Sequence, residues 1–302
     1  MKQALYYFAY ERFIKSDFDL SPVGLYPVKK KLCLKQKPLT ISNMGRLKYD
    51  RGYVNNQTML SRSDGYYYKK NIGLFKFVSG DEIKVFIDYL EFGSDFVRTL
   101  LNYPISCVFY QKKIFSLHAS AVAFQGKVII FPGSALTGKS TIAAYFLKNG
   151  GQLITEDTAV IEVFNNKAYV RSSYPFIKLS ASANSELSFS SSRGILLPTD
   201  RNERLGFLLN EKSFSVKLVP IDYCVFLEYG DRESVESLKS SDATLKLLGS
   251  SLNIYPLTET KQRELFHWAA NLARSMKILR FRRRRGILLS RFLANFIVKD
   301  KL

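Results

Sequence analysis

The sequence has few of the residues that build metal centres or disulfide frameworks. Its 302 residues include 2 histidines and 3 cysteines, and Cys33, Cys107 and Cys224 lie far apart. This spacing argues against a zinc site and against a disulfide framework, so we expect small core cysteines and a reducing, cytoplasmic compartment.

Long apolar runs are also missing, since no stretch reaches the roughly 18 residues that a membrane-spanning helix needs. The opening stretch, MKQALYYFAYERFIK, mixes charged residues into its apolar part and has no cleavage site of small residues. We therefore expect neither a transmembrane span nor a signal peptide.

Acidic residues are scarce beside basic ones, with 26 Asp and Glu against 45 Lys and Arg and a net charge of +19. Residues 277–302 hold nine basic residues and one acidic residue, a net of +8, and include RFRRRR at 280–285. A second basic cluster is KKKLCLKQK at 29–37. Such patches attract polyanions, and no recognised nucleic-acid motif accompanies them, so we expect no specific nucleic-acid site.

Two interpretations of the basic C-terminal segment stay open. It can bind an anionic partner, either an acidic acceptor peptide or an anionic membrane touched by residues 280–298, without taking part in the chemistry. Alternatively, its arginines cap the last helices and pair with surface acids.

What the sequence does contain, 46% hydrophobic and 14% aromatic residues, is enough for a globular α/β protein. We expect a strand-rich N-terminal region at 1–110, a nucleotide-binding core at 111–258 and a helical, basic C-terminal segment at 259–302. Helical patterns cover 94–111, 242–253 and 259–279, and KKIFSLHASAVAFQGKVIIFPG predicts two strands joined by FQGK.

The most specific motif is FPGSALTGKSTIAAYF, which fits the pattern G-x-x-x-x-G-K-[ST]. A strand pattern precedes it and a helix pattern follows, which is the context that a phosphate-binding loop requires. Backbone N–H groups and the helix dipole of such a loop favour an anion, its lysine reaches the β- and γ-phosphates, and its hydroxyl ligates Mg²⁺. The residues expected at nucleotide are Gly133, Ser134, Ala135, Leu136, Thr137, Gly138, Lys139, Ser140 and Thr141.

An acidic pair follows one helix later, at the end of the strand pattern QLITEDTAVI, where Asp157 lies 18 residues after Lys139. We expect this strand to run beside the strand of the loop and to bring Glu156 and Asp157 next to the phosphates. Two carboxylates there divide between Mg²⁺ ligation, with Ser140 and Asp157 as the ligands, and general-base work on a hydroxyl. His118, in a strand pattern, is by itself more typical of a core residue.

The segment from SLHASAV to the acidic pair resembles the core of HPr kinase/phosphorylase and its relatives. The weaker similarity outside 116–162 is to shorter enzymes of peptide-tailoring clusters, including kinases of lasso-peptide precursors. The resemblance implies a fold related to the kinase core of phosphoenolpyruvate carboxykinase, with Lys139, Glu156 and Asp157 at the reaction and His118 near the phosphates. It also draws attention to YPFIKLS and to Arg204 as a basic residue for the phosphoryl group.

The chain departs from this family at three points. Leu136 stands where relatives often have glycine, Glu156 stands where they usually have aspartate, and the later glycine-rich signature of HPr kinase is missing, which argues against HPr as the acceptor. The sequence therefore predicts an ATP- and Mg²⁺-dependent kinase that acts on a hydroxyl, such as serine, of a peptide or small molecule. The alternative is a regulatory module that binds nucleotide without phosphotransfer.

Overall fold

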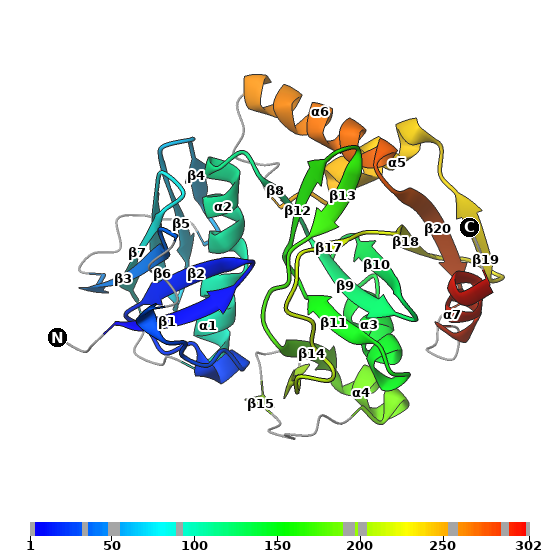
Figure 1. Ribbon diagram of the computed structural model, residues 1–302, viewed down its shortest axis with the longest axis horizontal. Coiled ribbons are helices and arrows are strands. Elements are labelled where there is room, and N and C mark those ends of the chain that lie inside the picture. The colour runs from blue at the N-terminus through cyan, green and yellow to red at the C-terminus, as the bar shows by residue number, and fades with distance from the viewer. Residues whose placement is uncertain are drawn as a thin grey trace.

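The computed structural model describes residues 4–31, 36–47, 55–88, 93–189, 197–198, 204–252, 259–284 and 290–299. These residues form a mixed α/β fold with four β-sheets (Figure 1). In the described residues no helix is long and apolar enough to cross a membrane.

The N-terminal unit, residues 4–111 in their described parts, is a seven-stranded sheet covered by two helices. In spatial order the strands are β1 (Leu5–Ala9), β2 (Arg12–Ser16), β3 (Leu39–Arg46), β7 (Glu82–Ile87), β6 (Gly73–Val78), β5 (Asp64–Lys69) and β4 (Thr58–Leu60). A short 3₁₀ helix, η1 (Ser21–Val23), and the helices α1 (Ser94–Leu101) and α2 (Tyr103–Gln111) complete the unit. The pattern at 94–111 is thus interrupted at Asn102, just before Pro104, because proline favours the first turn of a new helix.

The second unit is built on a six-stranded sheet, coloured mainly green to orange in Figure 1. Its strands are β11 (Gln152–Thr155), β9 (Ala119–Phe124), β10 (Lys127–Pro132), β18 (Tyr223–Tyr229), β20 (Lys277–Arg283) and β19 (Ser234–Ser237). As predicted, FQGK joins β9 to β10, and Gln125 and Gly126 both have positive φ, as a tight hairpin turn requires.

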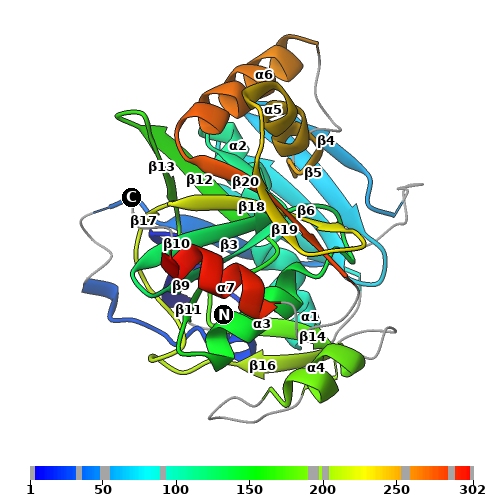
Figure 2. The same ribbon diagram turned by 90° about the vertical axis from the view of Figure 1, so that its right-hand side faces the viewer.

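Both faces of the six-stranded sheet are covered. One face carries α3 (Lys139–Lys148), α7 (Ser290–Lys299) and the three-stranded sheet of β14 (Phe176–Ser180), β16 (Arg204–Leu208) and β15 (Leu197–Pro198), with α4 (Ala181–Leu187) following β14 (Figure 2). The other face carries α5 (Ser240–Gly249), α6 (Glu259–Arg274) and the sheet of β17 (Val219–Pro220), β13 (Lys167–Val170), β12 (Ala159–Phe164) and β8 (Phe115–Leu117).

Strand direction brings several chain segments to one edge of the six-stranded sheet. β10, β18 and β20 pair in parallel, and β11 points the same way because β9 runs antiparallel to both of its neighbours. The carboxyl ends of β11, β10, β18 and β20 therefore lie at the same edge, where ligands bind in open α/β sheets. The start of β9, next to His118, reaches this edge from the opposite direction.

The position of β11 corrects one expectation. This strand does not run beside the loop's own strand β10, because β9 lies between them. Folding β9 back on β10 through a tight hairpin fills the neighbouring place with an antiparallel strand, so β11 joins at the edge. The direction of β11 still delivers Glu156 and Asp157 to the edge where the loop lies.

The C-terminal segment also differs from the helical segment that was expected. Helix α6 ends at Arg274, and Lys277–Arg283 forms strand β20, which lies between β18 and β19 in the six-stranded sheet. The reason is burial on both sides of the sheet: Ile278 packs in the core of one face, while Leu279 and Phe281 pack in the core of the other. The helical pattern of 259–279 could not reveal this pairing with the distant β18.

The two cysteines within the described ranges, Cys107 and Cys224, are fully buried and free. They are core residues, as expected, and Cys33 lies outside the described residues.

Candidate functional site

The predicted phosphate loop connects the end of β10 to the start of α3. Gly133 (φ +149°) donates its N–H to the His118 carbonyl oxygen at 3.1 Å, and Gly138 (φ +90°) precedes the first residue of α3, Lys139. Both glycines have backbone angles that residues with a side chain rarely adopt. The predicted strand and helix on either side of the motif are therefore present.

Lys139 and Thr137 hold the loop together from within. The Lys139 Nζ donates to the Ser134 carbonyl oxygen at 2.6 Å, and the Thr137 hydroxyl donates to the same oxygen at 3.0 Å. Leu136 has φ +68° and is 82% exposed, so the loop keeps at this position the left-handed conformation that glycine adopts most easily.

Glu156 and Asp157 lie at a sharp turn where the chain passes from the six-stranded sheet into the four-stranded sheet. The turn is closed by the Thr155 hydroxyl, which donates to the Thr158 carbonyl oxygen at 2.7 Å, and Asp157 has φ +62°. His118 lies at the reverse crossing, from β8 to β9, and its Nδ1 is 3.0 Å from the Asp157 carbonyl oxygen. The two segments that connect the four-stranded and six-stranded sheets are therefore in contact at His118 and Asp157.

The side chain of Glu156 points into the protein. Only 4% of the residue is exposed, its Oε2 accepts from the Lys178 N–H at 3.0 Å, and the nearby Ser140 side chain favours its charged form. We expected Ser140 to act with Asp157 on a metal ion; both residues line the same pocket, and their role as metal ligands stays a prediction.

The side chain of Asp157 makes an ion pair that the sequence did not predict. Its Oδ2 is 3.0 Å from the Nη2 of Arg98, a residue of α1 in the N-terminal unit. Arg98 is a single cation among the apolar residues of its helix and is 9% exposed. A buried arginine is a signal that a partner carboxylate lies nearby, but it does not say where.

A pocket of about 420 Å³ lies at this edge of the sheet. It is lined by these predicted residues: His118, Ala135, Leu136, Gly138, Lys139, Ser140, Thr141, Asp157 and Arg204. Gly133, Ser134 and Thr137, which belong to the loop, and Glu156, which is buried at the turn, are not among the lining residues. The structure therefore gathers the loop, the lysine, the histidine and one carboxylate around one space.

Further residues of the pocket were missed by the sequence analysis as site residues. They are Lys178, Leu179, Ser180, Ser182, Ala183, Glu186, Tyr229 and Arg283. Lys178 is 5% exposed and stands alone in the apolar strand β14, so a lone lysine in YPFIKLS was the available signal.

The arginine run, expected to bind a partner away from the chemistry, lies largely in β20 and partly at the pocket. The Arg283 Nη2 donates to the Thr137 carbonyl oxygen at 3.1 Å, and its guanidinium lies 4.8 Å from the centre of the Tyr229 ring. Arg280 and Arg282 pair with Glu228 and Glu236 at 3.2 and 2.8 Å. These ion pairs agree with the alternative of pairing with surface acids, and Arg285 lies outside the described residues.

The charges of the site move the pKa values of its groups in different directions. Burial lowers the pKa of Lys139 to about 8, although Asp157 and Glu156 favour its charged form. Burial, followed by the charge of Asp157, raises the pKa of Glu156 to about 8. Burial also acts to raise the pKa of Asp157, but the surrounding cations, Arg98 foremost, outweigh it and place the pKa below its usual range. For His118, burial and then Lys139 lower the pKa.

Comparisons with known proteins add little to this geometry. No family model and no curated protein matches the chain. Among solved structures it is similar to the HPr(Ser) kinase/phosphatase from Coxiella burnetii, with 12% identity, a TM-score of 0.33, and coverage of 61% of this chain and 88% of that chain. A TM-score this low carries no argument about fold or function, so the assignment of the site depends on its own residues.

Proposed function

We propose that the chain is a kinase that transfers the γ-phosphoryl group of ATP, with Mg²⁺, to a hydroxyl group of a peptide or small molecule, such as the hydroxyl of serine. The observation that carries the proposal is that Lys139 and Asp157 line one pocket at the edge of the six-stranded sheet. The loop supplies a cation and a helix start for phosphates, and the acidic turn supplies a base for a hydroxyl.

The charges that line the pocket suit a polyphosphate. Four cationic side chains, Lys139, Lys178, Arg204 and Arg283, face the same space as the two acidic ones, Asp157 and Glu186. Phosphoryl transfer needs mainly positioning and positive charge around the transferring group, because little covalent chemistry is left to the protein. The loop, the lysines and the arginines are groups of that kind.

In the proposed reaction the acceptor oxygen forms a bond to the γ-phosphorus. The bond between that phosphorus and the oxygen that bridges to the β-phosphate breaks, and ADP leaves with the bond electrons. The proton of the acceptor hydroxyl passes to the Asp157 carboxylate. The charges of Lys139 and Arg204 favour the phosphoryl oxygens on which negative charge gathers.

The donors beside the loop fit a magnesium ion. Ser140 offers a hydroxyl, and the neighbouring acidic pair Glu156 and Asp157 offers carboxylate oxygens, and Mg²⁺ prefers oxygen ligands. Among the described residues no group of three or more His, Cys, Asp or Glu could hold a metal ion by itself, so phosphate oxygens and water would complete the shell. A bound ion would supply positive charge at the β- and γ-phosphates.

The proposal is tested by incubating the chain with Mg²⁺ and γ-labelled ATP, alone and with serine-containing peptides, and by following ADP and labelled product. Asp157→Asn should lower the transfer rate by ~10²-fold, the range of a lost general base. ATP affinity without Mg²⁺ should not fall below that of the wild type, because the substitution removes a negative charge that repels the phosphates.

Tight ATP binding without ADP formation under any acceptor would support the alternative of a regulatory nucleotide-binding module. If the chain does not bind ATP, both the kinase function and the regulatory alternative are wrong. An Asp157→Asn variant that turns over as fast as the wild type would assign the acidic pair to the structure only.

A further inference from the structure

Arg98 crosses from the N-terminal unit to the turn that carries Asp157. Its Nη2 is 3.0 Å from Asp157 Oδ2, its Nη1 is 3.4 Å from Asp95 Oδ1, and its guanidinium lies 5.7 Å from the centre of the Phe176 ring. The arginine side chain is 11% exposed, so these contacts form in a largely desolvated place where charge-assisted hydrogen bonds are strong.

Asp157 is held at two further points. Its backbone has φ +62°, a conformation that costs an ordinary residue energy and persists only where the surroundings enforce it. Its carbonyl oxygen is 3.0 Å from His118 Nδ1. In the part of the chain that the structure describes, no donor is bonded to Oδ1, while the residue lines the pocket.

We propose that Arg98 is a positioning residue that holds the Asp157 carboxylate by Oδ2, so that the other oxygen faces the acceptor hydroxyl. The inference builds on the proposed kinase function. This role of Arg98 makes the N-terminal unit part of the active site, because the residue that orients the general base Asp157 comes from α1. Arg98 does not line the pocket, so it acts through Asp157 and does not touch the nucleotide.

Arg171 provides a matched control, because it joins the same two units with the same kinds of contact. It pairs with Glu162, donates to the Tyr10 carbonyl oxygen at 2.9 Å, and lies 5.4 Å from the centre of the Phe109 ring. Its side chain is 16% exposed, close to that of Arg98. None of these partners lines the pocket, so the loss of Arg171 reports the cost of weakening the contact between the units alone.

The experiment compares Arg98→Ala, Arg98→Lys and Arg171→Ala in the full chain by steady-state ATP turnover. A carboxylate displaced by about 1 Å can cost ~10²-fold in rate, so Arg98→Ala should lower kcat by at least ~10-fold. The KM for ATP should change by less than ~2-fold, because the substitution does not alter contacts that bind ATP equally in the ground state and in the transition state. Arg98→Lys restores one charged donor and should recover kcat to within ~3-fold of the wild type, and Arg171→Ala should stay within ~2-fold.

A double-mutant cycle separates positioning from a general structural effect. If Arg98 acts only through Asp157, then Arg98→Ala added to Asp157→Asn should lower kcat no further than Asp157→Asn alone. Should the alanine variant fail to fold, Arg98→Met keeps the apolar stem against Phe176 and takes its place in the cycle.

Equal losses of kcat in Arg98→Ala and Arg171→Ala, or a full additional loss in the double variant, would overturn the positioning role while leaving the kinase function in place. A wild-type chain that binds ATP and never turns it over would refute the kinase function itself, and this inference with it.

Discussion

Leu136 and Asp157 both line the pocket and share a left-handed backbone, with φ +68° and +62°. The two residues differ in how they are held. Asp157 is bonded through its carboxylate and its carbonyl oxygen, whereas Leu136 is 82% exposed at the tip of the loop. The leucine therefore fits the geometry of the loop but adds strain that a glycine would not have.

We predict that Leu136→Gly raises the free energy of unfolding by about 0.5 kcal/mol. Replacing leucine by glycine removes the strain of a left-handed backbone, which stabilises the folded chain by roughly 1–2 kcal/mol. Glycine also has more conformational entropy in the unfolded chain, which offsets about 0.5–1 kcal/mol of this gain. Denaturant unfolding measures the difference. Leu245→Gly is the control: this leucine is also exposed, at 64%, but helical, so its variant should lose about 1 kcal/mol. A destabilised Leu136→Gly would show that the leucine side chain makes contacts that matter.

A second prediction at the residue scale concerns Lys139. Lys139→Ala should abolish transfer and weaken ATP binding while the chain stays folded, because Lys139 is the residue of the loop that brings a full positive charge to the phosphates. Calorimetric titration with ATP measures the affinity. Lys127→Ala, at the opposite end of β10, should bind ATP like the wild type. An unchanged affinity in folded Lys139→Ala would contradict the assignment of the loop.

At the scale of elements, β20 is the part of the fold whose role changes most between sequence and structure. Its side chains alternate between the sheet faces, and its carboxyl end places Arg283 against the loop. Gly138 has φ +90°, which favours glycine, and a Cβ there would also meet the Nη2 end of the Arg283 side chain. One strand thus supports the core and the site together.

Substitution of two neighbouring arginines of β20 should affect ATP affinity differently. Arg283→Ala should weaken ATP binding by ~10-fold, equivalent to about 1.4 kcal/mol, because the loop loses a donor at Thr137 and the pocket loses a cation. Arg282→Ala removes only the ion pair with Glu236, in which both side chains are at least 40% exposed, so ATP affinity should not change. Equal effects of the two variants, measured by titration at one salt concentration, would point to the summed charge of the segment instead.

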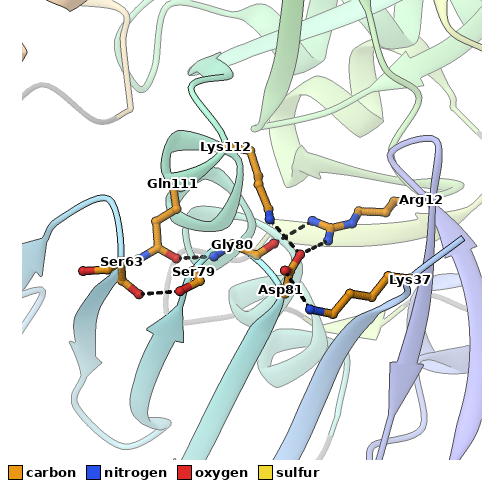
Figure 3. A network of polar contacts seen from close by, with 8 residues as sticks. All are labelled: Arg12, Lys37, Ser63, Ser79, Gly80, Asp81, Gln111 and Lys112. Atoms are coloured by element: carbon orange, nitrogen blue, oxygen red, sulfur yellow. Dashed lines mark hydrogen bonds and ion pairs between the residues drawn. The ribbon is translucent and has the colours of Figure 1, made fainter.

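At the scale of the whole molecule, the two units are joined by a shared core and by buried charge. One hydrophobic cluster contains residues of α1 and α2 together with Phe115, Val160 and Leu265 of the second unit. Within the N-terminal unit, the turn between β6 and β7 is fixed by Asp81, which accepts from Arg12, Lys37 and Lys112 at 2.8, 3.0 and 2.9 Å (Figure 3). Gly80 beside it donates to Gln111 Oε1 at 2.7 Å.

This cluster predicts how stability depends on pH. Burial acts to raise the pKa of Asp81, but hydrogen bonds from Lys112, Lys37 and Arg12 outweigh it and lower the pKa from 3.8 to about 2. Because the folded pKa is the lower one, the stabilisation is present above about pH 4 and is lost as the pH falls toward 2. The difference in Tm between wild type and Asp81→Asn should therefore be largest near neutral pH and shrink below pH 4.

The neighbouring Glu82 provides the comparison for Asp81. Its ion pair with Lys84 is 3.6 Å long and both side chains are about one third exposed, so Glu82→Gln should change Tm little at any pH. A Tm difference for Asp81→Asn that stays constant down to pH 2 would mean that the ion pairs do not carry the stabilisation.

Local patterns in the sequence determined the parts of the site that lie within one short segment. The loop from Gly133 to Thr141 needs a strand, a turn with two glycines and a helix, and all three are encoded by neighbouring residues. The short spacing to Glu156 and Asp157 placed the acidic turn one helix later, at the correct edge. The assignment of their chemical roles stays a prediction that the proposed experiments test.

Only the tertiary structure decided which distant residues complete the site. Arg98 reaches Asp157 across 59 positions of sequence, and Arg283 reaches Thr137 across 146, so no local pattern contains either contact. The insertion of β20 beside β18 depends on burying Ile278, Leu279 and Phe281 on both faces of a sheet that forms only when the whole chain is folded. Helical and strand patterns are similar for such a short apolar run, and the surroundings chose the strand.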